Sequence, residues 1–263
     1  MSNTGIRHGL SGYTLKLIAV VTMLIDHIAY CFYPLLDRGL YHAMRHVGRI
    51  AFPLFCFLLV EGLRHTRSRL KYLRNLAVFA LISELPSDLA FRSWQNRGAG
   101  MSIFATLTLG LLVLAAAEAF EAECRKRDYG AVPAVLFFLA ASCAAIGVAE
   151  LLHVEYRKWG VGLILMIALS ERLTEILPVR TGERALPLWH SIAASAAVLV
   201  WLAAYDLAAH RLIESYGVAS LAPILLYNGE RGSYRLPKWF FYVFYPAHLC
   251  VLLLAIYLSN LPE

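Results

Sequence analysis

Long runs of apolar residues, separated by short polar stretches, dominate this chain. A membrane-spanning helix needs about 20 mostly apolar residues, whereas a soluble helix repeats its apolar positions every three or four residues. The runs here are of the first kind. They predict an all-α fold, a polytopic transmembrane helical bundle of about nine spans.

The eighth of these predicted spans is the weakest, because it is short and contains Glu214, Gly217 and Pro223. A re-entrant segment is an alternative there. No hydrophilic block is long enough to fold alone, so residues 1–263 are expected to form one integral-membrane domain. The predicted spans lie near 14–36, 46–63, 72–91, 101–120, 131–152, 159–178, 187–206, 211–227 and 238–260.

Composition agrees with a membrane protein. The chain is 59% hydrophobic and 16% charged, whereas soluble domains are about 25% charged. The loop 64–74 carries five Lys or Arg residues, which predicts that it is cytoplasmic. With nine spans, the N-terminus is then cytoplasmic. The basic residues lie in short loops, so the net charge of +6 points to membrane lipids rather than nucleic acid.

The five cysteines show no CxxC spacing, and most of them fall inside apolar runs. Free core cysteines are therefore expected, with neither disulfides nor a metal site.

Lys16 and His27 form the most informative pair in the first span. They are eleven positions apart, so they share a helical face and are separated by roughly 16 Å. Ionisable groups at mid-membrane cost about 2.5–3.5 kcal/mol each and usually mark function. His27, tuned by burial and by an acid such as Asp26, suits a general base. Two alternatives are a buried His that specifies packing and a haem ligand paired with His248.

The second and third predicted spans contain further polar residues. Arg49 is expected at the outer end of the second span, and Glu61 near its inner end. Pro53 leaves a backbone carbonyl close to Arg49 without its helical hydrogen bond, which can make a polar site there. The alternative for Arg49 is a cation that reaches the membrane interface.

The third span contains Glu84 and Asp88 on similar faces, one turn apart. Pro86 lies between them and is expected to interrupt the helix. Two acids in one span favour a functional role over packing.

Two short motifs follow in the last third. The loop from Tyr227 to Gly232, which includes Asn228 and Arg231, offers backbone amides and a cation that could bind phosphate, although alone it is a turn. His248 follows Pro246 in the last span, beside Tyr245. The alternative is that the aromatic residues of this segment lie at the membrane interface, but this does not explain the presence of His248.

Six strings occur in order along nearly the whole chain: LKLIAVVTMLIDHI, GRIAFPLFCFLLVEG, RSRLKYLRNL, ISELPSDL, YNGERG and FYPAHL. Together they resemble the TraX family of membrane proteins, which is related in outline to the wider group of transmembrane acyltransferases. The chain departs from the family at one place. Family members often have Asp-Tyr-Gly there, whereas this chain has VEYRKWG over residues 154–160. No role is therefore assigned to Glu155.

The resemblance implies an acetyltransferase of the bacterial inner membrane that uses acetyl-CoA, with His27 either as general base or as carrier of the acetyl group. The founding member is linked to N-terminal acetylation of conjugative pilin. The related acyltransferases share a basic residue, ten intervening residues and a His in the first span, which Lys16 and His27 reproduce. The acceptor is then an amine or hydroxyl of a pilin N-terminus or an envelope glycan.

The candidate residues fall into three groups, and no metal ligand is among them. The catalytic candidates are His27, Asp26, Glu84 and Arg49. The candidates for acetyl-CoA binding are Lys16, Tyr72, Asn228 and Arg231, and those for substrate binding are Glu61, Asp88, Tyr245 and His248.

Two other classes of function stay open. In a proton-coupled transporter, Asp26, His27, Glu61 and Glu84 would form a proton relay, although the sequence shows no internal repeat of the kind such transporters often have. In a non-catalytic assembly factor, the polar residues would only hold helices together.

Overall fold

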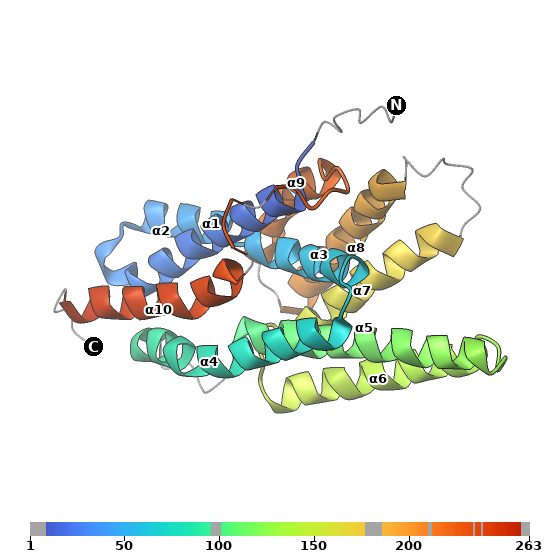
Figure 1. Ribbon diagram of the computed structural model, residues 1–263. Coiled ribbons are helices and arrows are strands. Elements are labelled where there is room, and N and C mark those ends of the chain that lie inside the picture. Colours follow the sequence, from blue (N-terminus) through green and yellow to red (C-terminus); the bar gives the residue numbers. More distant parts are fainter. Residues whose placement is uncertain are drawn as a thin grey trace.

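The structure is a computed structural model, which describes residues 9–95, 101–176, 186–209, 212–233, 235–237 and 239–258. These residues form a helical bundle, as predicted. Long helices run side by side, with α1 between α2 and α10, and with α5 between α4 and α6 (Figure 1). Within the described ranges, strand pairing is limited to one parallel bridge between Leu10 and Tyr227.

The elements follow the order of the predicted spans. The helices are α1 (Gly12–Cys31), α2 (Arg38–Gly48), α3 (Ala51–Arg64), α4 (Arg69–Gln95), α5 (Ile103–Lys126), α6 (Val132–Leu151), α7 (Arg157–Ile176), α8 (Leu186–Ala209), α9 (Leu221–Leu225) and α10 (Phe240–Leu258), with 3-10 segments η1 (Tyr33–Leu35) and η2 (Glu214–Ser220).

Six helical segments of the described chain are long and apolar enough to cross a membrane: α1, the α2–α3 segment, α5, α6, α8 and α10. The protein is therefore a multi-pass membrane protein. The predicted third and sixth spans correspond to α4 and α7, which are helices but fall outside this set of six. Positions 178, 211, 238 and 260, where three of the predicted spans begin or end, lie outside the described residues.

The prediction of a full eighth span was wrong. Residues 212–227 contain only η2 and α9, which together rise about 20 Å, less than the roughly 30 Å hydrocarbon thickness. This irregular segment packs against α8 and α3. Its start contacts Arg49 through Glu214, and its end contacts Glu61 through Tyr227. The non-helical backbone of this segment therefore packs against other helices, which is the condition under which such backbone is tolerated within a membrane.

The expected interruption at Pro86 was also wrong, because α4 continues through it from Arg69 to Gln95. A proline removes one backbone hydrogen bond and usually bends a helix. Here α4 packs along α5 and α10, and Pro86 itself is buried. Tertiary packing therefore keeps the helix intact.

Small residues allow close helix contacts in the core. Gly110 of α5 lies against Ile164 of α7, and a Cβ at position 110 would come within 2.5 Å of the Ile164 Cδ1 atom. Ile164 is fully buried, so it has little room to move. This contact fits the use of small residues where membrane helices approach each other closely.

We expect Gly110→Ala to destabilise the bundle by about 1–3 kcal/mol, because the added methyl overpacks the α5–α7 contact. The measurement is the midpoint of thermal unfolding in detergent. The matched control is Gly147→Ala on α6, where a Cβ meets nothing within 4 Å and alanine favours the helix. Equal midpoints for the two variants would contradict the tight α5–α7 packing.

Candidate functional site

A cavity of about 780 Å³ opens between α1, α3, α4, α5 and α10. Basic side chains line one part of it: Lys16, Arg67, Lys71 and Arg231. Aromatic and aliphatic side chains line the rest, among them Val20, Met23, Leu58, Phe104, Leu107 and Tyr245. A charged mouth thus leads into an apolar interior, which suits an elongated ligand with an anionic head and an uncharged tail.

Backbone contacts hold the mouth together. The amides of Gly12 and Tyr13, at the start of α1, donate hydrogen bonds to the carbonyls of Glu230 (2.8 Å) and Arg231 (3.0 Å). These amides have no partner within their own helix, so the loop satisfies them. As a result Lys16 and Arg231 line the same cavity, and the Lys16 ammonium lies 5.7 Å from the centroid of the Phe241 ring.

An ion-pair cluster borders the mouth. Glu61 accepts a hydrogen bond from the Tyr227 hydroxyl (3.2 Å) and lies 3.7 Å from Arg64. Arg64 also contacts Glu171 of α7 (3.0 Å) and the His190 ring of α8 (2.7 Å). The cluster therefore ties the end of α3 to two other helices beside the cavity.

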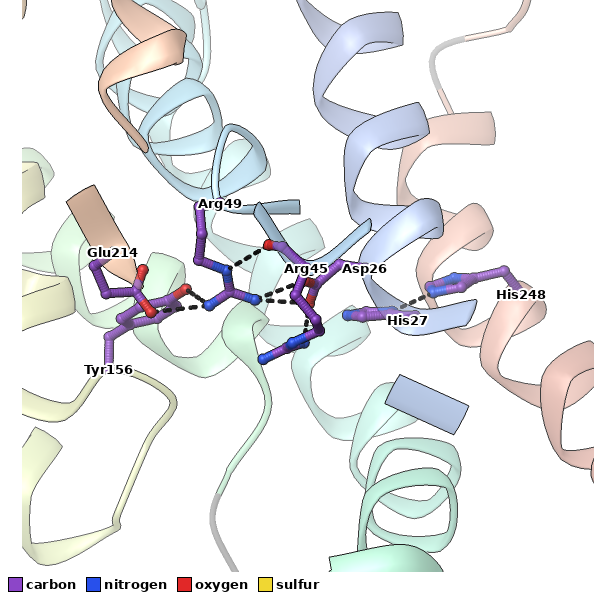
Figure 2. Close-up of polar contacts among 7 residues, drawn as sticks. All are labelled: Asp26, His27, Arg45, Arg49, Tyr156, Glu214 and His248. Atoms are coloured by element: carbon purple, nitrogen blue, oxygen red, sulfur yellow. Dashed lines mark hydrogen bonds and ion pairs between the residues drawn. The ribbon is translucent and has the colours of Figure 1, made fainter. Parts of the chain in front are cut away.

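His27 and His248 form a buried hydrogen-bonded pair (Figure 2). The His27 Nδ1 and the His248 Nε2 are 2.6 Å apart. The centroid of the Tyr245 ring, which lines the cavity, lies 6.0 Å from the His27 ring. Tyr245 thus connects the pair to the cavity, although neither histidine lines it.

The hydrogen bonds determine the tautomers of a neutral pair. The His248 Nδ1 is 2.8 Å from the Phe244 carbonyl oxygen, so it must carry the proton that it donates. The His248 Nε2 is then an acceptor, and the His27 Nδ1–H donates to it. The His27 Nε2 is left with a free lone pair, as a general base or nucleophile requires. Direct contact between the rings also leaves no room for a haem iron between them.

A buried group of charges surrounds Asp26, on the other side of His27 from His248 (Figure 2). The Arg45 Nη1 lies 2.6 Å from one Asp26 oxygen, and the Arg49 Nη2 lies 2.7 Å from the other. Asp26 therefore pairs with two arginines rather than with His27, since neighbours on a helix point about 100° apart. A side chain at Gly48 would overlap the Asp26 carboxylate.

Arg49 joins this group to two further elements. It lies at the junction of α2 and α3, where Pro53 removes a backbone hydrogen bond. Its Nη1 contacts Glu214 of η2 (2.9 Å) and donates to the Tyr156 hydroxyl (3.0 Å). One guanidinium thus satisfies two acids and a phenol from three parts of the chain, which is the forked geometry that arginine provides.

Comparison with known proteins places this chain. The family model described as TraX protein matches residues 11–256. The chain belongs to the TraX family. The match covers the cavity, the His27–His248 pair and the Asp26–Arg49 group.

A curated relative from Dichelobacter nodosus, "Probable fimbrial assembly protein FimC, serogroup H1", is 30% identical over 257 residues. These cover 92% of this chain and 94% of that protein. No solved structure matches the chain significantly.

Several predicted site residues of this TraX-family protein come together. Lys16, Tyr72, Arg231, Glu61 and Tyr245 all line the cavity. Glu61 is therefore beside the residues expected to bind acetyl-CoA, not on the side of Asp26 and Arg49.

Other predicted residues lie elsewhere. Glu84 accepts hydrogen bonds from the Ser102 amide (2.9 Å) and hydroxyl (2.8 Å), and so covers the start of α5. Asp88 is half-buried on α4 and does not line the cavity. Asn228 accepts from the Glu230 amide, 3.0 Å away, and shapes the loop.

The corner between α6 and α7 contributes residues that the sequence did not assign. Tyr156 has a φ of 60° and Arg157 one of 46°, a conformation that non-glycine residues adopt at a cost of about 1–3 kcal/mol. The Tyr156 ring stacks on Phe52 at 4.0 Å. No periodicity marks such a corner, although Glu214 stood out as an acid in an apolar run.

We expect Asp26→Ala or Arg49→Ala to cost about 3–5 kcal/mol of stability, because each leaves a buried charge unpaired. The double variant should lose about 1–3 kcal/mol less than the sum of the two. Denaturation in detergent measures both. The control is Arg125→Ala, whose side chain is 78% exposed in its pair with Glu121 and which should cost less than about 1 kcal/mol. Additive losses would contradict the pairing.

Proposed function

We propose that this TraX-family protein is an acetyltransferase embedded in the bacterial inner membrane. It moves an acetyl group from cytoplasmic acetyl-CoA to an amine or hydroxyl of an acceptor. The single observation that supports this best is the cavity, because it joins four basic side chains to a residue in contact with the His27–His248 pair.

The donor side follows from the shape of the cavity. Its volume of about 780 Å³ is in the range of small-molecule sites. In this proposal Lys16 and Arg231 bind the phosphates of acetyl-CoA, and Tyr72 contacts its cytoplasmic part. The apolar interior takes the uncharged arm. Lys16 and His27 are about 16 Å apart along α1. In this proposal the uncharged arm of acetyl-CoA is extended over that distance, and its thioester lies next to Tyr245.

His27 acts as the general base in this scheme. Its Nε2 takes a proton from the acceptor while the acceptor nitrogen or oxygen bonds to the acetyl carbon. The carbon–sulfur bond then breaks. The His27 imidazolium gives its proton to the departing sulfur, so CoA leaves as the thiol. His248 holds the productive tautomer, the part that an acid plays in a catalytic triad. Tyr245 is the donor best placed for the oxyanion, since Arg49 is already bound to Asp26 and Glu214.

The acceptor is assigned by analogy. The name of the Dichelobacter nodosus relative refers to fimbrial assembly, so a pilin N-terminus is the first acceptor to test, and an envelope glycan is the second. The same name favours a non-catalytic role in assembly as the rival function. Incubation of purified protein with radiolabelled acetyl-CoA separates them, because an assembly factor would transfer no label.

We expect His27→Ala to lower acetyl transfer at least about 100-fold, because the general base is lost, while the variant elutes as a folded protein in detergent. The measurement is the rate of label transfer from acetyl-CoA to an envelope fraction. His153→Ala, at an exposed position outside the helices, is the control. A fully active His27→Ala would overturn the mechanism. Proton flux in liposomes without acetyl-CoA binding would indicate the transporter instead.

We expect Lys16→Ala to raise the apparent KM for acetyl-CoA roughly 10-fold and to change kcat less, because a charge-assisted contact to phosphate is worth about 1.5–3 kcal/mol. Steady-state kinetics with varied acetyl-CoA measure this. Lys126→Ala, at an exposed residue outside the cavity, should leave KM unchanged. An unchanged KM in Lys16→Ala would remove Lys16 from the donor site.

A further inference from the structure

The cavity ends about one helical turn short of the His27–His248 pair. Its lining residues on α1 share one helical face: Gly12, Lys16, Val20 and Met23. His27 is the next residue on that face, about 6 Å beyond Met23 along the helix, and it does not line the cavity. On α10 the lining likewise ends at Tyr245, three residues before His248. Met23 and Tyr245 are therefore the last lining residues before the pair on their two helices.

Protein encloses this end of the cavity. Met23 is 7% exposed and Tyr245 is 3% exposed, whereas Arg67 and Lys71 at the mouth are exposed residues. The Phe104 ring meets the Tyr245 ring edge to face, with centroids 5.2 Å apart. The start of α5 thus adds a third wall of buried side chains: Ile103, Phe104 and Leu107. Because a close-packed interior yields little, these side chains fix the room at the closed end.

A buried polar atom at the closed end favours a ligand there. The Tyr245 hydroxyl makes no hydrogen bond of normal geometry within the described part of the chain. Leaving a buried hydroxyl in that state is costly, so a ligand that brings an acceptor oxygen to it is stabilised. A thioester carbonyl is such an acceptor. With its carbonyl at Tyr245, a thioester places its acyl chain among the apolar side chains of the closed end.

We propose that Met23 determines the length of the acyl group that the protein transfers, because it closes the cavity just beyond the thioester, so that acetyl fits and longer chains do not. This inference rests on the proposed acetyltransferase function, and the bonds formed and broken are those given above. Of the two last lining residues Met23 is the apolar one, and it lies between the cavity and His27 along α1. Each further methylene would have to displace this buried side chain, and a hydrophobic pocket discriminates about 10- to 200-fold per methylene.

The test is a competition between two thioesters in the same sample. Full-length protein in proteoliposomes receives acetyl-CoA and butyryl-CoA labelled with different isotopes, with the envelope fraction of cells that lack this protein as acceptor. We expect the wild type to prefer acetyl over butyryl at least about 100-fold in kcat/KM, since butyryl carries two more methylenes. Met23→Ala should lower this preference at least 10-fold, because it opens the closed end.

Two variants serve as controls. Met23→Leu conserves the volume of the side chain and should keep the preference of the wild type. Met166→Ala makes the same truncation on α7, at a partly buried residue that does not line the cavity, and should also keep it. The preference is a ratio within one sample, so a smaller folded fraction of any variant does not change it.

The outcomes separate this inference from the function on which it rests. A wild type that transfers butyryl as readily as acetyl overturns the role of the closed end and leaves the acyltransferase standing. An unchanged preference in Met23→Ala, or an equal change in Met166→Ala, overturns the role of Met23. A wild-type protein that transfers label from neither thioester overturns the proposed function and the role of Met23 together.

Discussion

The pairing of Asp26 with Arg49 is the interaction on which the rest of the site depends. A lone charge in the membrane interior is costly, so each must find a partner in the tertiary structure. Because Arg49 also binds Glu214 and Tyr156, this requirement joins α1, the α2–α3 junction, η2 and the α6–α7 corner at one point. The short eighth segment keeps its place partly because it supplies Glu214.

This arrangement puts two unlike environments on the two sides of one pair of imidazoles. From the basic mouth, a cavity with an apolar interior reaches Tyr245, beside His27 and His248. From the other side, the charged group around Asp26 packs against the same helix turn. The fixed tautomer of the pair directs the free lone pair of His27 away from His248.

Much of the site could be predicted from local sequence. The helical period places Lys16 and His27 on one face, and α1 keeps both on a single unbroken helix. The basic loop and Arg231 were expected near Lys16, and they line the same cavity. The partner of His27 was not predictable, because Asp26 is adjacent in sequence but points elsewhere, whereas His248 is 221 residues away. Glu84, one of the catalytic candidates, instead accepts a hydrogen bond from the Ser102 amide at the start of α5.

By itself the sequence determined the class of this protein, the order of most of its helices and the residues whose burial would need explanation. Hydropathy and helical period are local properties, and they determine these features without knowledge of the fold. Only the tertiary structure decided which charges neutralise each other, that Pro86 does not break α4, and that Tyr156 reaches the site. Those outcomes depend on contacts between distant segments, and a buried charge is satisfied by whichever partner the packing brings within reach.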